Sequence, residues 1–268
     1  MTVLKIDRPA PGVVRLLINR PQKRNAVDQE TRTALVDALE ATQADADCRA
    51  IVLGGVDHVF SAGGDLPSML GQSEQQARER MRHGHRACRL IANSRVPVVA
   101  AAEGFCAGAV IGLALLSDAV IAGRDTRFLF PFLRLGLVPD WGLLRSLPMR
   151  IGVPAARRIF TSARAVSGEE AYRIGLVDEF VDGGDVMLAS VERAAALASL
   201  SPRAYERMKR ALLQPSPGFE ADLRREEDDQ TAMFLGGDFP EGYAAFTEKR
   251  DPVFTALPPG VRGDDPRS

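Results

Sequence analysis

Residues that bind metals or form disulfides are scarce in this sequence. Its 268 residues include three histidines and three cysteines. Cys48, Cys88 and Cys106 are odd in number and far apart along the chain, whereas zinc sites and disulfide frameworks need closely spaced or paired cysteines. The sequence therefore predicts neither kind of site, and it fits a reducing compartment.

The sequence also lacks an excess of charge and any long apolar run. The formal net charge is −1 and basic residues are dispersed, which argues against a nucleic-acid groove or a membrane-surface patch. No apolar stretch approaches the roughly 18 residues of a membrane span, and prolines and charges interrupt the N-terminal region where a secretory signal needs an apolar core. Since 46% of the residues are hydrophobic, we expect a globular, cytoplasmic protein with a large core.

What the chain does contain is an alternation of short apolar runs and amphipathic segments, which is typical of an α/β protein. Strands are expected over residues 3–6, 13–18, 50–53, 96–102, 118–122 and 175–181. Helices are expected from an N-cap at Asp28 to about Ala44, after Ser167, and over residues 74–93, 154–161 and 186–200. Beyond residues 201–202 the sequence is helical and charged, and residues 244–250 close the last helix. The end of the chain, from about residue 258, is expected to be disordered or a surface strap.

Residues 97–118 organise the chain in our interpretation. An apolar run reaches a turn at residues 103–104, and the small residues 106–109 then open an apolar helix. The first amides of a helix have no internal partner and carry partial positive charge, so small residues there let an anionic ligand approach the backbone. A tightly packed buried helix is the structural alternative. Residues 59–66 repeat the pattern and place a second amide donor at Ala62, although Gly63 and Gly64 also suit a simple turn.

Asp140 stands out because it lies in a strongly apolar segment, residues 126–142. Burial of an unpaired carboxylate raises its pKa, and such a group carries protons well near neutral pH. The sequence equally allows Asp140 to be the N-cap of a following helix. His83 and His85 on the helix of residues 74–93 are interpreted as solvated side chains in the first instance.

Six segments in order resemble the crotonase (enoyl-CoA hydratase/isomerase) superfamily over nearly the whole chain. They are NRPQKRNA, VFSAGGDL, EGFCAGAVIGLALLSD, RLGLVPDWG, SGEEAYRIGLVDE and AAFTEKR. The resemblance implies an α/β fold, a crotonase-like ββα superhelix with a C-terminal α-helical trimerisation region. Residues 1–200 would form the core with the acyl-CoA site, and residues 201–268 the oligomerisation region of a homotrimer or of a hexamer made from two trimers. It implies an acyl-CoA thioester as ligand, and no metal or cofactor apart from the coenzyme A of the substrate.

The resemblance also carries site residues over to this sequence. It implies backbone amides at Ala62 and Ala109 as the oxyanion donors. Coenzyme A contacts are implied at Lys23, Arg24 and Ala26, with Phe246 and Lys249 reaching the nucleotide of a neighbouring subunit. Phe132 and Trp141, together with Phe128 and Phe130, suggest an apolar acyl pocket that the core could equally account for.

Two departures from the family pattern bear on the chemistry. Gly112 and Phe132 occupy the positions of the two glutamates that activate water in hydratases of this superfamily, so ordinary hydration is not expected. Asp140 matches the acid/base aspartate of the single-aspartate enoyl-CoA isomerases, such as the epoxyphenylacetyl-CoA isomerase group. We therefore expect a shift of a C=C bond through an enolate. A non-catalytic acyl-CoA binder, hydration by an atypical route, and chemistry like that of aryl-CoA dehalogenases, using His85 with Asp140, are the alternatives.

Overall fold

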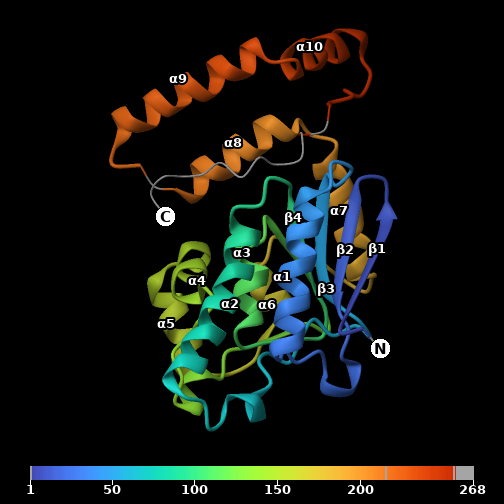
Figure 1. Cartoon of the computed structure of the whole chain (residues 1–268). Helices are drawn as coiled ribbons and strands as arrows, with labels where there is room; N and C mark the ends of the chain where they lie inside the picture. Colours follow the sequence, from blue (N-terminus) through green and yellow to red (C-terminus); the bar gives the residue numbers. More distant parts are fainter. Residues whose placement is uncertain (1, 215, 256, 258–268) are drawn as a thin grey trace.

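A six-stranded sheet forms the centre of the protein. The computed structural model describes residues 2–214, 216–255 and 257, and Figure 1 shows the chain. The strands of this sheet are β1 (Leu4–Ala10), β2 (Val13–Ile18), β3 (Ala50–Gly55), β4 (Val98–Ala102), β6 (Ala119–Gly123) and β9 (Glu179–Val181), in the order β1-β2-β3-β4-β6-β9. β1 is antiparallel to β2, and every later pair is parallel. Every residue of β3, β4 and β6 is buried, because helices cover both faces of a parallel sheet.

Helices from different parts of the chain cover the two faces of this sheet. On one face, α1 (Gln29–Ala44), α2 (Glu74–Ala92) and α3 (Val110–Leu116) share a core with residues such as Leu53 and Val98. On the other face, α7 (Val186–Ala198) packs on residues such as Val52 and Val99. Neighbouring strand residues thus enter different cores, as the alternation of a strand requires.

The ends of several helices lie where the sequence predicts them. The side chain of Asp28 accepts a hydrogen bond from the Thr31 amide at 2.9 Å and caps α1, as expected. Ser73 and Gln76 form a capping box at the start of α2. α5 (Val153–Ser162) and α6 (Gly168–Arg173) are also close to their expected positions. α4 (Leu143–Ile151) completes the helices of the core region.

A small second sheet was not anticipated from the sequence. It consists of β5 (Phe105–Ala107), β7 (Arg127–Leu129) and β8 (Val166–Ser167), in the order β5-β7-β8. The chain leaves the large sheet at Gly104, where φ is +51° and an added Cβ would lie 2.4 Å from the carbonyl oxygen of His58. The expected turn before α3 therefore contains a strand as well, and that strand determines where the helix begins.

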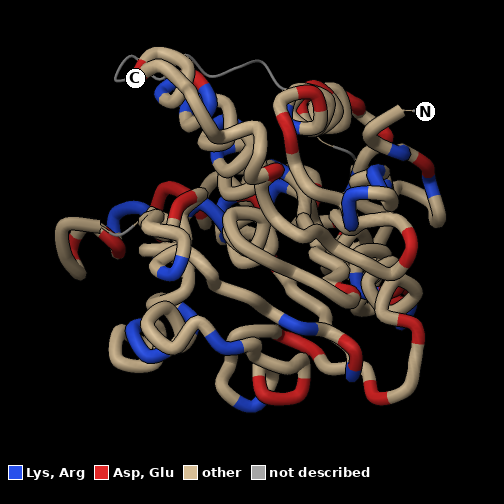
Figure 2. Tube along the Cα trace, turned by 90° about the horizontal axis from the view of Figure 1, so that it is seen from below, with Lys and Arg blue, Asp and Glu red and all other residues tan. Residues whose placement is uncertain are grey.

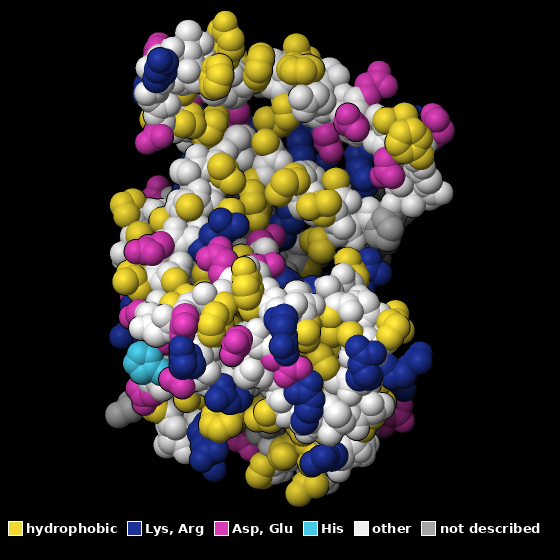
Figure 3. All heavy atoms as spheres, turned by 180° about the vertical axis from the view of Figure 1, so that it is seen from behind, with side chains coloured by type: hydrophobic (Ala, Val, Ile, Leu, Met, Phe, Trp, Pro, Cys, Tyr) yellow, Lys and Arg dark blue, Asp and Glu magenta, His cyan; other side chains and the backbone are white. Residues whose placement is uncertain are grey.

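The C-terminal helices form an arm beside the body of the protein. α8 (Pro202–Leu213) is followed by α9 (Phe219–Leu235) and α10 (Asp238–Glu248), and Figure 1 places α9 and α10 at the top, apart from the sheet. α9 buries no residue. Large exposed hydrophobic residues on α9 and α10 are Phe219, Leu223, Phe234, Leu235, Phe239, Tyr243 and Phe246. Figure 3 shows yellow hydrophobic side chains along this arm and a gap beneath it.

Charges of both signs are interspersed along the chain, as Figure 2 shows. Over the described part of the chain, no helix combines the length and the apolar character needed to cross a bilayer. Among the same residues, no group of three or more His, Cys, Asp or Glu side chains is placed to hold a metal ion. The expectation for the end of the chain, from about residue 258, concerns residues that lie outside the described ones.

Candidate active site

A cavity of about 750 Å³ lies between the turn after β3, α2, the start of α3 and residues 131–145. Its walls are largely apolar, with side chains such as Met69, Met81 and Leu137. Gly64, Ala109 and Asp140 also line it. An apolar cavity with a few convergent polar groups is the usual form of a small-molecule site.

Hydrogen bonds join the two turns that form one wall of the cavity. The amide of Ser61 donates to the carbonyl of Phe105 at 2.9 Å, and the amide of Ala107 donates to the carbonyl of Ser61 at 3.0 Å. Between them Gly63 has φ +95°, and an added Cβ would lie 2.7 Å from the carbonyl oxygen of Ala107. Only glycine fits this close approach, so the turn after β3 and the start of α3 lie side by side.

The amide predicted at Ala62 is wrong as an oxyanion donor. Its N–H donates to the carbonyl of Arg24 at 2.8 Å and is already used within the fold. The N–H groups of Gly64 and Ala109, by contrast, make no hydrogen bond to any residue that the structure describes, and both residues line the cavity. Free main-chain donors from two adjacent turns can bind one oxygen atom. The sequence signal for the first of these donors was the pair Gly63-Gly64.

Asp140 is the only carboxylate among the described residues that line the cavity. Its Oδ1 is buried without a hydrogen-bond partner in the described structure, and burial raises the pKa of this carboxyl from 3.8 to about 6. The N-cap of α4 is Gly142, with no capping side chain. The amide of Leu143, in the first turn of α4, donates to the main-chain carbonyl of Asp140 at 3.0 Å and not to its side chain. The capping alternative is therefore wrong, and the carboxyl is free to act in the cavity.

Trp141, which follows Asp140 in the sequence, is held in a narrow space between two helices. Trp141 is buried and has φ +48°, a left-handed conformation that a bulky residue adopts only when its surroundings impose it. An added Cβ would lie 2.3 Å from the indole Nε1 at Gly84 on α2, and 2.2 Å from the Trp141 carbonyl oxygen at Gly112 on α3. These two glycines form a slot for Trp141. A glutamate side chain at position 112 therefore has no room in this structure.

The aromatic residues suggested for the acyl pocket divide into two groups. Phe132 begins the 3-10 helix η3 (Phe132–Leu135) and lines the cavity together with Trp141. Phe128 and Phe130 belong to the fully buried core and do not line the cavity. The interpretation of Phe128 and Phe130 as pocket residues is thus wrong, and packing accounts for them.

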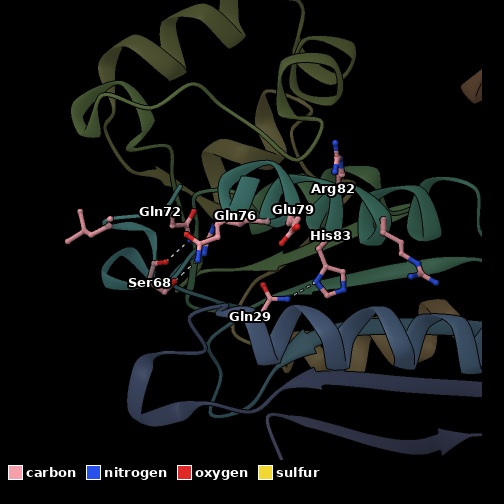
Figure 4. Close-up of a pocket in the computed structure, with 11 residues that line it drawn as sticks. Gln29, Ser68, Gln72, Gln76, Glu79, Arg82 and His83 are labelled. Atoms are coloured by element: carbon pink, nitrogen blue, oxygen red, sulfur yellow. Dashed lines mark hydrogen bonds between the residues drawn. The ribbon is translucent and has the colours of Figure 1, made fainter. Parts of the chain in front are cut away.

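The two histidines of α2 face different surroundings. His85 lines the cavity. His83 lies in a neighbouring polar pocket, shown in Figure 4, which is formed by α2, residues 68–72 and Gln29 of α1. There its Nδ1 lies 3.3 Å from Nε2 of Gln29, and burial together with Arg32 lowers the pKa of His83. Gln29 in turn accepts a hydrogen bond from the buried Arg32, so this second pocket is a network within the α1–α2 interface.

The residues expected to contact coenzyme A are not all together in one chain. Lys23 and Arg24 are exposed on the turn η1 (Pro21–Lys23) and its C-cap, and the Arg24 carbonyl bonds to Ala62 at the cavity wall. Ala26 follows on the same loop. Phe246 lies on α10, 84% exposed, and Lys249 caps that helix. Figure 1 shows α10 at the top and η1, in dark blue, at the bottom, so the two sets of residues lie far apart within one chain.

The chain is similar to known proteins over nearly its whole length. The family model described as enoyl-CoA hydratase/isomerase matches residues 9–257. Crotonyl-CoA hydratase of Syntrophomonas wolfei is 32% identical over 244 residues, 89% of this chain and 93% of that protein. 1,2-Epoxyphenylacetyl-CoA isomerase of Escherichia coli is 30% identical over 249 residues, 91% of this chain and 95% of that protein. The crystal structure of an enoyl-CoA hydratase from Bacillus anthracis has a TM-score of 0.89 at 27% identity, covering 95% of this chain and 100% of that chain.

The chain therefore belongs to the enoyl-CoA hydratase/isomerase family, the crotonase superfamily, and has its α/β fold. Enzymes of this family act on coenzyme A thioesters and use no further cofactor. This protein is accordingly an acyl-CoA-processing enzyme of the family. Relatives of nearly equal identity are named as hydratases and as an isomerase, so similarity alone does not choose the reaction.

Proposed function

We propose that this protein is an enoyl-CoA isomerase that moves a C=C bond along an acyl-CoA thioester, with Asp140 as acid and base. The single observation that carries the proposal is a cavity with two free main-chain donors and one carboxylate among its described lining residues, that of Asp140, whose Oδ1 is buried without a partner. One proton carrier suffices for isomerisation, whereas the two-glutamate hydration of this superfamily needs two.

In the proposed mechanism the thioester oxygen accepts hydrogen bonds from the amides of Gly64 and Ala109. The Asp140 carboxylate removes a proton from the carbon next to the thioester, and the electron pair of that C–H bond moves onto the thioester oxygen as an enolate. The protonated Asp140 then returns the proton two carbons further along the chain. No oxidant, water or metal is consumed, and Phe132 keeps water away from the intermediate.

The pKa of Asp140 suits both halves of this cycle. At about 6 it leaves the carboxyl ionised and ready as a base at neutral pH, yet close enough to neutrality to return a proton readily. Activity should therefore fall as the pH drops through about 6, because the protonated carboxyl no longer accepts a proton.

The test compares the wild-type protein with Asp140→Asn on a panel of 3-enoyl-CoA thioesters. Two signals are followed: movement of the double bond, and exchange of α-protons with deuterium from D2O. Asp140→Asn should lose activity about a hundredfold or more while its affinity for the thioester stays near the wild-type value. An exposed residue, Asp125, supplies the matched control Asp125→Asn, which should behave as wild type.

Unchanged exchange in Asp140→Asn would refute the role of Asp140. If the wild-type protein binds acyl-CoA but shows neither proton exchange nor double-bond movement, the protein is a non-catalytic acyl-CoA binder instead.

Hydrolytic dehalogenation of an aryl-CoA is the second candidate, because His85 lines the same cavity as Asp140. In that reaction Asp140 would displace a halide from the aryl ring as a nucleophile, and His85 would activate water for hydrolysis of the resulting ester. Turnover of a 4-halobenzoyl-CoA in H218O, with the label entering the Asp140 carboxyl, would support this candidate and replace the isomerase.

We further propose that residues 201–268 form the oligomerisation region of a homotrimer or of a hexamer made from two trimers. The exposed apolar side chains of α9 and α10 support this proposal, because large exposed hydrophobic surfaces usually mark an interface. The same arrangement would let Phe246 and Lys249 of one subunit approach a nucleotide held by Lys23, Arg24 and Ala26 of another.

A further inference from the structure

The cavity contains a cation that the proposed mechanism has not used. Arg80 lies on α2, is partly buried, and lines both the cavity and the polar pocket of Figure 4. Its Nη1 donates to Oγ of Ser68 at 3.2 Å. Within the described residues no carboxylate lies at ion-pair distance from it. A partly buried guanidinium without a counter-ion is costly, so its position calls for an anion that the cavity receives during the reaction.

The guanidinium lies beside the main-chain donor of Gly64. A Cβ added to Gly64 would be 3.3 Å from Nη2 of Arg80 and 2.3 Å from Cε of Met69. The space beside the Cα of Gly64 is thus bounded by the cationic end of Arg80. Gly64 and Arg80 line the same cavity, so a ligand atom held at Gly64 has a positive charge nearby.

Of the carboxylates around Arg80, Asp140 has the strongest electrostatic influence on it. Asp28 and Asp65 both pair with Arg20, at 2.9 and 3.5 Å, and are largely neutralised. Asp140 exerts the largest carboxylate influence on the pKa of Arg80, and Arg80 in turn opposes the burial that raises the pKa of Asp140. Arg80 therefore interacts electrostatically with the acid of the proposed proton transfer.

We propose that Arg80 is a third charge-stabilising group of the reaction, which holds the enolate negative charge on the thioester oxygen together with the amides of Gly64 and Ala109. This inference rests on the proposed enolate chemistry. When the α-proton moves to Asp140, the electron pair moves to an oxygen that is flanked by two dipoles and one full charge. A full charge in a partly desolvated site is worth more to a developing anion than it is in water.

The experiment uses acetoacetyl-CoA, a β-keto thioester that ionises to an ultraviolet-absorbing enolate without any double-bond shift. The pH midpoint of enolate formation is measured on the bound probe in the wild type, Arg80→Met and Arg80→Lys. The wild-type protein should lower this midpoint relative to the free probe. Arg80→Met should raise it by about one pH unit or more, a factor of about ten in stabilisation, and Arg80→Lys should lie between the two.

The matched control is Arg82→Met, on the same helix but exposed and lining only the pocket of Figure 4. It should leave the midpoint of the bound probe unchanged. Equal midpoints in the wild type and in a folded Arg80→Met would overturn the proposal. If Arg80→Met affected only the KM of acyl groups that carry a distal carboxylate, Arg80 would be a tail-binding residue and the proposal would be wrong.

Kinetics give a second readout that a purely structural role would not produce. Removal of the cation should raise the pKa of Asp140, so Arg80→Met should move the acid limb of the α-proton exchange profile to higher pH and lower kcat about ten- to a hundredfold with little change in KM. The two proposals fail separately. If the midpoint of the bound probe depends on Arg80 but the protein moves no double bond, only the proposed isomerase function is refuted. If the protein is an isomerase but the midpoint does not depend on Arg80, only the proposed role of Arg80 is refuted.

Discussion

The buried acid at position 140 should cost the fold stability, and Asp140→Asn should restore it. The pKa of this carboxyl rises from its ordinary 3.8 to about 6 in the folded protein, mainly through burial. This rise is about two pH units, and at about 1.4 kcal/mol per unit it corresponds to about 3 kcal/mol. Asparagine has the same shape and no charge. The variant should therefore be more stable than the wild type at pH 7 by up to about 3 kcal/mol.

The sign of the pH dependence follows from proton binding. Between 3.8 and about 6 the folded state holds the Asp140 proton more tightly than the unfolded state does. The contribution of this group to the free energy of unfolding therefore falls as the pH rises through that window and is constant above it. The advantage of Asp140→Asn should shrink to about 1 kcal/mol at pH 4.5 and disappear below the unfolded pKa.

Urea denaturation at pH 7 and pH 4.5 measures this advantage. Protein concentration is kept constant, because assembly makes apparent stability concentration-dependent, and Asp125→Asn serves as the exposed control. The buried amide is left without a partner, so about 3 kcal/mol is an upper value. An Asp140→Asn protein that is no more stable than the wild type at pH 7, or that gains equally at both pH values, would refute the reasoning.

Three further predictions test other parts of the site. Gly112→Ala should lower the free energy of unfolding, measured in urea, by about 1–3 kcal/mol, because its Cβ would lie 2.2 Å from the Trp141 carbonyl oxygen. Gly112→Glu should gain no enoyl-CoA hydration activity, and a gain would show that Trp141 moves to make room for the glutamate. Ala109→Pro removes one of the two oxyanion N–H donors, and the backbone of Ala109, with φ −56°, already has the conformation that proline requires. The steady-state kcat should fall about a hundred- to a thousandfold, and an unchanged kcat would exclude the Ala109 amide from the mechanism. Leu235→Lys charges a side chain that is 83% exposed on the arm, and light scattering should then detect a smaller assembly, whereas an unaltered mass would contradict the role of α9.

Local signals in the sequence predicted much of the fold. Side-chain caps such as Asp28 act within one helical turn, and the parallel strands are continuous apolar runs, so both can be recognised without tertiary information. β5 and β8 have three and two residues. Strands this short have no periodicity of their own and form only because the chain brings partners beside them.

The site was less predictable because its geometry depends on distant segments. The amide of Ala62 is occupied by the carbonyl of Arg24, a contact that no local pattern encodes. Whether Asp140 caps a helix or lines the cavity depends on the residue at which α4 begins. Because α4 begins at Leu143, its N-cap is Gly142, and the Asp140 side chain does not cap the helix. Arg80 belongs to a helix with charges on most sides, and only the packing of α2 against the turn after β3 identifies the side chain that faces the cavity.

The slot between Gly84 and Gly112 has a practical consequence. Trp141 is the one tryptophan of the chain, and it is covalently next to the residue on which the chemistry depends. Tryptophan emission from this protein, excited selectively over that of its three tyrosines, thus originates at a single indole in the wall of the reaction chamber. Occupancy and ionisation there become optically visible without a label.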